Sequence, residues 1–141
     1  MDFTTSFKIS GSGLAAQRAK LDMITSNLAN IDTTRTAEGG PYRKKAVAFS
    51  AEALEGNFDA TIRDAMKSVK VDMIAEAPNA VKTIYDPAHP DADAGGYVVV
   101  PNINIMTEMA DMIAASRAYE AGVAALDATK SMTLKTLDIG K

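Results

Sequence analysis

Large apolar residues near the N-terminus recur mostly at intervals of seven. They are Phe7, Leu14, Leu21, Ile24, Leu28 and Ile31. A repeat of 3.5 residues gathers apolar side chains into a narrow stripe that packs against another helix. The pattern predicts a helix over residues 12–31, with Ser12 as its N-cap. Gly11 and Gly13 lower the helix propensity before that point, and the turn-forming residues 30–41 should end the helix.

A second apolar repeat near the C-terminus advances by alternating steps of four and three. It consists of Ile105, Met109, Met112, Ser116, Tyr119, Val123 and Leu126. A helix should start after Pro101, with Asn104 as its cap and Glu108 near its positive end. It should run to about Leu137, which makes roughly 33 residues and about 50 Å.

Such spacing is more often the core face of an ordinary helical bundle than a seam between subunits. The middle of the chain, however, has few large apolar residues with which to cover both stripes. We therefore expect the two termini to pair with each other or with neighbouring chains, which points to assembly rather than to catalysis.

Short β-like runs separate the two helices. They cover residues 42–49, 69–74, 81–85 and 97–100. Residues 52–67 are ambiguous between a helix and a turn, and residues 86–96 read as a loop. The predicted fold is mainly α with a small β-containing middle. Its parts are an N-terminal helical segment (1–33), a loop and β region (34–101) and a long C-terminal helix (102–141) that forms one structural unit with the first.

Composition narrows the possible functions. The 141 residues are 47% hydrophobic and 23% charged, which is typical of a folded protein. A net charge of −3 is too balanced to favour nucleic acid or an anionic membrane as partner. Cysteine is absent, so disulfides and thiolate chemistry are excluded. The N-terminus does not resemble a cleaved signal peptide, and no apolar run is long enough to insert into a bilayer.

Candidate chemistry is sparse. His89 is the only histidine, and Asp86, Asp91 and Asp93 lie close to it in the sequence. They imitate the start of a calcium loop but lack its later ligands, so turn formation is favoured over metal binding. The basic cluster at residues 43–45 is expected to be a solvated strand face or a contact with an acidic neighbouring subunit. We predict no catalytic, cofactor-binding or metal site.

Several motifs, in the right order, resemble the bacterial flagellar rod and hook proteins. The residues that carry the resemblance are Asn27, Leu28, Ala29, Asn30, Thr33, Thr34, Arg35, Pro41, Tyr42, Tyr85, Pro87, Tyr97, Asn102, Arg117 and Tyr119. Many members continue after the Asn-Leu-Ala-Asn motif to Thr-x-Gly-Tyr. The Thr-Thr-Arg found here instead is similar to the proximal rod members. The first motif, residues 27–30, is also expected to end the helix through left-handed Asn backbone and Asn bonds to the main chain.

The resemblance implies a structural subunit of the basal-body rod in the periplasm, without enzymatic activity. It implies export through the flagellar type III apparatus without a cleaved signal. Implied partners are copies of itself, the rod proteins FlgB, FlgF and FlgG, the adaptor FliE and the basal-body ring. Combined with the two repeats, it leads us to expect an antiparallel coiled coil of the terminal helices. The assembly interface would be formed by the apolar residues of the two repeats.

Other functions stay open at this point. A cytosolic coiled-coil adaptor or a flagellar export chaperone would carry a similar helical pattern. Another rod protein is the alternative within the same family. A peptidoglycan-cutting enzyme is the least favoured, because no acid pair can be placed on rigid elements.

Overall fold

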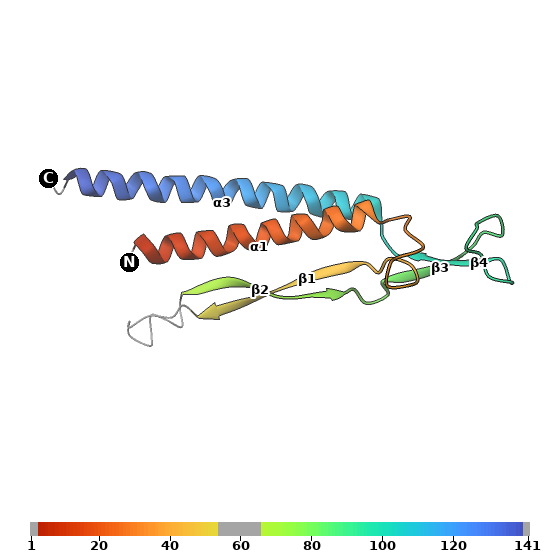
Figure 1. Ribbon diagram of the computed structural model, residues 1–141. Coiled ribbons are helices and arrows are strands. Elements are labelled where there is room, and N and C mark those ends of the chain that lie inside the picture. The colour runs from red at the N-terminus through yellow and green to blue at the C-terminus, as the bar shows by residue number, and fades with distance from the viewer. Residues whose placement is uncertain (1–2, 54–65, 140–141) are drawn as a thin grey trace.

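The computed structural model describes residues 3–53 and 66–139 and shows an elongated molecule built from two helices and two β-hairpins (Figure 1). Its elements are α1 (Phe3–Ala29), β1 (Lys45–Ala53), β2 (Lys67–Glu76), β3 (Val81–Tyr85), β4 (Tyr97–Pro101) and α3 (Ile105–Ile139). The helices run in opposite directions, and both termini lie at the same end (Figure 1). The prediction of terminal helices around a small β-containing middle is confirmed.

Helix α1 starts nine residues earlier than predicted. Ser12 is not a cap but an interior residue of the helix. Its hydroxyl donates to the carbonyl of Ile9 at 2.8 Å and accepts the Val69 N–H of β2 at 3.1 Å. Contact with the hairpin therefore holds a stretch whose two glycines disfavour helix, a case in which tertiary contacts override local propensity.

Helix α1 ends close to the predicted position, but the asparagines that end it act only partly in the predicted way. Asn30 donates from Nδ2 to the Ser26 carbonyl at 2.9 Å, as expected of an asparagine that bonds the main chain. The expectation of left-handed backbone at the asparagines of residues 27–30 is wrong. Among the described residues, Asn79 is the only non-glycine with positive φ, at 56°. The side chain of Asn27 instead points into the molecule, as described below.

The predicted cap of the second long helix is confirmed. Asn104 Oδ1 accepts the backbone N–H groups of Met106 at 3.0 Å and Thr107 at 3.3 Å. These bonds satisfy two of the free donors at the start of α3. The helix then continues to Ile139, two residues beyond the predicted end.

The β-like runs form two antiparallel hairpins. In the first, Ala48 pairs with Met73 and Phe49 with Val71, so that Asp72 is passed over as a bulge. The bulge interrupts the alternation of β2, so that Val69, Val71 and Ile74 pair with Ala51, Phe49 and Val47 on one face of the hairpin. Strand β1 begins at Lys45, three residues after the predicted start, because the preceding residues turn toward the helices. Most of the ambiguous span 52–67 lies outside the described residues.

The second hairpin pairs Val81 with Pro101 and Tyr85 with Tyr97. Its connection over residues 86–96 is the loop expected from the sequence. Asp86 N–H donates to the Gly96 carbonyl at 2.9 Å and closes this loop.

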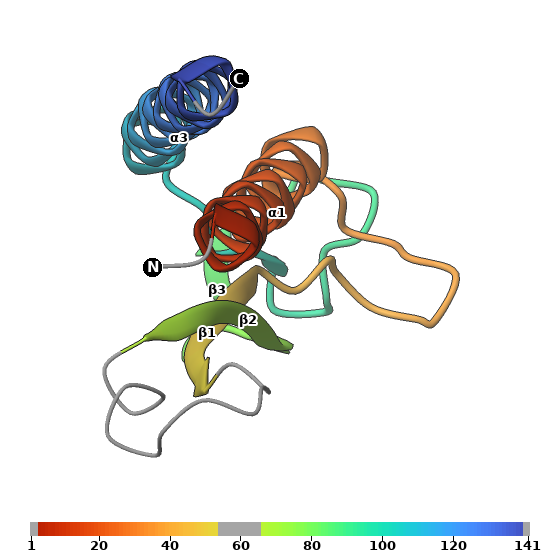
Figure 2. The same cartoon turned by 90° about the vertical axis from the view of Figure 1, so that its left-hand side faces the viewer.

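The elements form three layers, with α1 between α3 and the β1–β2 hairpin (Figure 2). The buried apolar core is small and lies between α1 and α3 and in and around the second hairpin. It consists of Ala16, Ile24, Tyr42, Ala80, Val98, Ile103 and Ala115. Helix α3 contributes only Glu108 and Ala115 to the buried set, so most of its length has one covered side and one open side.

Candidate functional site

The most buried row of α3 faces α1 and consists of small or polar residues, flanked by partly buried Met112 and Leu126. This inner row consists of Glu108, Ala115, Gly122 and Thr129, spaced by seven. Glu108 and Ala115 are each only 2% exposed. A Cβ placed on Gly122 would lie 2.8 Å from Leu14 Cδ2 of α1. The missing side chain at Gly122 therefore lets the two helices approach closely.

A second row of α3 residues lies roughly 90° around the helix from the inner row, since each residue advances by about 100°. This outer row consists of Ile105, Met109, Ile113, Val123 and Leu134, whose exposed fractions range from 37% at Val123 to 54% at Ile113 and Leu134. Among the described elements, α1 is the one with which α3 packs extensively. The outer row is thus a set of apolar residues, with Ser116, Glu120 and Asp127 between them, that the described part of the chain leaves open.

The residues predicted for the assembly interface divide between these surfaces. On the N-terminal side, Ile24 is buried, and those partly buried are Phe7, Leu14, Leu21, Leu28 and Ile31. On α3, Met112 and Leu126 are partly buried, and the more exposed residues are Ile105, Met109, Tyr119 and Val123. The structure brings Leu14 against α3 and leaves Ile105 and Met109 outside the contact.

A buried polar junction lies where the C-terminal end of α1 meets the start of β1 and the start of α3. We define it as Asn27, Tyr42, Lys44, Lys45 and Glu108. Asn27 Oδ1 accepts the Tyr42 hydroxyl at 3.0 Å and the Lys45 N–H at 3.1 Å. Its Nδ2 donates to the Lys45 carbonyl at 2.9 Å and to Glu108 Oε2 at 3.3 Å. All four bonding positions of this amide are used, as a buried amide requires.

The other oxygen of Glu108 pairs with Lys44. The distance from Lys44 Nζ to Glu108 Oε1 is 2.7 Å, and the carboxylate is 3% exposed. The prediction that residues 43–45 form a solvated face or bind an acidic neighbour is therefore wrong for Lys44, whose partner is in the same chain. Arg43 pairs with Glu76 at 2.8 Å on the surface. Sequence reasoning had assigned Glu108 only to the helix dipole.

The motif residues after α1 anchor the loop of the second hairpin. Thr34 Oγ1 donates to Asp91 Oδ2 at 2.7 Å, and the Arg35 guanidinium pairs with the other oxygen. The hydrogen bond from Thr34 and the charge of Arg35 lower the pKa of Asp91 below its ordinary value. Tyr42 N–H donates to the Thr33 carbonyl at 2.9 Å, which folds this segment back on itself.

The loop residues that imitated a calcium site form turns, as expected. His89 Nδ1 accepts the Asp91 N–H at 3.1 Å, and Asp93 Oδ1 accepts the N–H groups of Gly95 and Tyr97 at 2.8 and 2.9 Å. Asp86 Oδ1 accepts the Ala88 N–H in the same way at 3.1 Å. Across residues 3–53 and 66–139, no cluster of three His, Cys, Asp or Glu side chains could hold a metal ion.

The remaining motif residues have packing roles or lie on the surface. Tyr85 and Tyr97 meet edge to face with ring centroids 5.2 Å apart, next to Pro87 and Gly96. Asn102 Nδ2 donates to the Asn79 carbonyl at 3.0 Å. Ala29 and Arg117 are exposed, and Pro41 is partly buried.

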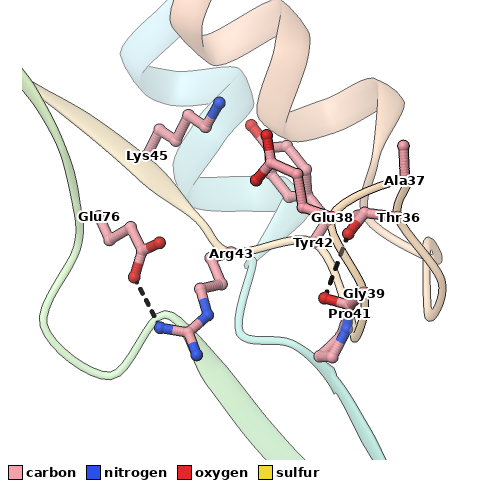
Figure 3. A pocket seen from close by; sticks show the side chains of 9 residues that line it. All are labelled: Thr36, Ala37, Glu38, Gly39, Pro41, Tyr42, Arg43, Lys45 and Glu76. Atoms are coloured by element: carbon pink, nitrogen blue, oxygen red, sulfur yellow. Dashed lines mark hydrogen bonds and ion pairs between the residues drawn. The ribbon is translucent and has the colours of Figure 1, made fainter.

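An open depression of about 430 Å³ lies between the loop after α1 and the start of the first hairpin. Figure 3 shows Arg43 turned toward Glu76 at its edge. Lys45 Nζ lies 5.8 Å from the centroid of the Tyr42 ring, within cation–π range. Its cations thus already have partners, and of its two acids Glu76 is paired with Arg43. No helix in the described part of the chain is long and apolar enough to cross a membrane.

Comparison with known families matches both ends of the chain. Residues 7–35, which cover most of α1 and the loop to Arg35, match the family described as "Flagella basal body rod protein". Residues 94–139, which cover β4 and α3, match "Flagellar basal body rod FlgEFG protein C-terminal". The two matches therefore cover most of the helix pair, including Asn27 and Glu108 of the junction.

Relatives align over nearly the whole chain. Identity to the flagellar basal-body rod protein FlgC of Bacillus subtilis is 41%, over 96% of this chain and 97% of the relative. Identity to FlgC of Salmonella typhimurium is 42%, over 96% of each chain. Identity to FlgC of Borreliella burgdorferi is 40%, over 99% of this chain and 98% of the relative. The chain therefore belongs to the family of flagellar basal-body rod proteins, in the group of FlgC.

Proposed function

We propose that this chain is a structural, non-enzymatic subunit of the flagellar basal-body rod that binds neighbouring subunits through its helix pair. The observation that carries the proposal is the outer row of α3, in which five large apolar side chains are exposed on the open side of a long helix. Surfaces of this kind mark sites of protein association. Burying the exposed half of one such side chain contributes about 1 kcal/mol.

We further propose that α1 and α3 form an antiparallel coiled coil. The inner row repeats every seven residues, as a seam between supercoiled helices does. The contact of Leu14 with Gly122 and that of Asn27 with Glu108 support a continuous pairing. From one contact to the other, α1 advances by thirteen residues and α3 by fourteen. The two helices therefore cover nearly the same length along the seam.

The structural partners of the two most constrained carboxylates support the absence of enzymatic activity. Glu108 is paired with Lys44 and Asn27, and Asp91 is held by Thr34 and Arg35. Both carboxylates have structural partners, so neither is free to act as an acid or base on a substrate.

Neighbours in the rod would be copies of this chain and other rod proteins, for which FlgB, FlgF, FlgG, the adaptor FliE and the basal-body ring are the candidates. The family resemblance supports a periplasmic location and export through the flagellar type III apparatus without a cleaved signal. No contact among the described residues favours a cytosolic adaptor or an export chaperone over a rod subunit.

A charge on the outer row tests the proposal. Met109→Asp and Ile113→Asp place a carboxylate where a neighbour would bury it, and both positions are exposed in the free chain. Ala125→Asp is the matched control, because it is exposed on nearly the opposite side of α3. We expect the first two variants to be expressed but absent from purified hook–basal bodies, and the control to be incorporated. Normal rods with both outer-row variants would contradict the proposal.

A further inference from the structure

Helix α3 has two rows of side chains, the inner row and the outer row, either of which could in principle face α1. The inner row includes Gly122, Ala115 and a carboxylate and is flanked by partly buried Met112 and Leu126, whereas the outer row has large apolar side chains with Glu120 and Asp127 between them. Rotation toward the outer row would bury its apolar side chains but expose Met112 and Leu126, so hydrophobic burial alone does not fix which side of α3 meets α1. In the structure the inner row faces α1, and the outer row stays exposed.

The polar junction opposes a rotation of α3. Glu108 is bound on one oxygen by Lys44, from the segment before β1, and on the other by Asn27, from α1. Turning the outer row toward α1 would carry Glu108 away from both partners. It would leave the amide of Asn27 short of an acceptor and Lys44 without its buried partner, and groups left unpaired in this way are costly.

We propose that the Glu108–Lys44 pair is a specificity determinant that fixes which side of α3 faces α1. Buried ion pairs add little net stability compared with apolar residues of the same size, but they can select one register or orientation over another. The pair would thereby keep the outer row available for another subunit. That consequence rests on the proposed function of the outer row, whereas the orientation itself does not.

Close packing is the competing explanation for the same orientation. A Cβ on Gly122 would lie 3.5 Å from Leu14 Cγ and 2.8 Å from its Cδ2. Close contact of this kind would also favour the orientation in which the inner row faces α1, with no contribution from the ion pair. An experiment must therefore remove the ion pair while leaving Gly122 and Leu14 in place, or replace them identically in every background.

Because the chain has no cysteine, engineered disulfides can report the orientation. In Leu14→Cys the new sulfur would occupy the place of Leu14 Cγ, 3.5 Å from a Cβ at position 122, which suits a disulfide after a small adjustment. The purified full-length chain would carry Leu14→Cys together with either Gly122→Cys or Val123→Cys. The first pair reports the inner row and the second reports a rotated α3.

Each cysteine pair is combined with Lys44→Met and Glu108→Leu, which replace the ion pair by apolar groups of similar size. Asn27 keeps three of its four bonds in this background. We expect helicity by circular dichroism to be retained, and the ratio of 14–123 to 14–122 cross-linking to rise about tenfold. Arg43→Met with Glu76→Leu removes the exposed ion pair instead and is expected to leave the ratio unchanged.

An unchanged ratio after loss of the Glu108–Lys44 pair would overturn the proposal in favour of close packing. If the double variant loses its helicity, the cross-linking ratio is measured in Glu108→Gln instead. This variant keeps the size of the side chain and an acceptor for Asn27 but removes the charge. A raised ratio in that variant supports the proposal, and an unchanged ratio overturns it. The assay uses the free chain, so its result is separate from the rod-incorporation test of the proposed function.

Discussion

The side-chain amide of Asn27 bonds both main-chain groups of Lys45, accepting its N–H at 3.1 Å and donating to its carbonyl at 2.9 Å. In this geometry the amide takes the place of a strand neighbour at the first residue of β1. The last turn of α1 is thereby tied to the first hairpin. Through Glu108 the same amide also contacts α3, so one side chain joins all three layers.

Replacement of Asn27 by Asp should weaken the fold strongly. A carboxylate cannot donate to the Lys45 carbonyl or to Glu108, and it adds a second negative charge to a site that is 2% exposed. We expect the free energy of unfolding in urea to fall by about 3 kcal/mol. Asn30→Asp is the control, because Asn30 is less buried and its amide donates to a single carbonyl, and it should lose about 1 kcal/mol. Equal losses in the two variants would refute a special role for Asn27.

Charges on the two helices should separate folding from assembly. Leu21 is partly buried in α1, so Leu21→Asp should lower stability and prevent incorporation into rods. Val123 is 37% exposed, so Val123→Asp should change the stability of the free chain by only about 0.5 kcal/mol while still preventing incorporation. Urea unfolding and the protein content of purified rods measure the two effects. Rods that contain the Val123→Asp variant at the normal level would show that this position stays exposed after assembly.

Asp91 should make the anchoring of the second hairpin sensitive to acid. Its pKa is lowered by the Thr34 hydrogen bond and by Arg35. A carboxyl whose pKa is lower in the folded state stabilises the fold above its unfolded pKa of about 3.9 and loses that contribution as pH falls through the folded value. Asp91→Asn should therefore be less stable than the parent at neutral pH and equally stable in strong acid. Thermal unfolding across this range tests it, and a difference that persists in acid would count against the ion pair and hydrogen bond as the cause.

Two glycines with positive φ allow backbone strain to be distinguished from steric conflict. Gly96 has φ of 79°, and a Cβ there would lie 3.0 Å from Tyr85 Cε2 and 3.1 Å from Pro87 Cγ. Gly39 has φ of 91°, with no atom within 4 Å of a Cβ. Gly39→Ala should cost about 1 kcal/mol from strain alone, and Gly96→Ala about 2 kcal/mol or more because it also crowds the aromatic pair. The free energy of unfolding in urea measures both, and equal costs would mean that the loop relaxes without resistance.

The sequence predicts the parts of the fold that depend on local chemistry. Asn104 caps α3 where its residue type and position suggest, and the turn residues 86–96 form the loop between β3 and β4. The family motifs were also visible in the sequence. The contacts of Thr34, Arg35 and Asn27 give several of these motif residues a physical role in the fold.

What escaped prediction depends on contacts between distant residues. Ser12 has the chemistry of a cap, but the Val69 N–H from another element holds it inside a longer helix. The 3–4 pattern of α3 included Ile105, Met109 and Val123 of the outer row but also the partly buried Met112 and Leu126, because periodicity cannot say which side of a helix meets its neighbour. That choice involves Glu108 and Lys44, which are far apart in the sequence and show no pattern that would link them.

The most direct test of the central claim, that this chain is a building block of the rod, is mass spectrometry of purified hook–basal bodies, with a deletion strain examined in parallel. We predict that the chain is a stable component of the rod fraction, and that the deletion strain lacks rods and motility. Loss of motility with no trace of the chain in the purified particle would contradict a structural role and favour an export chaperone instead.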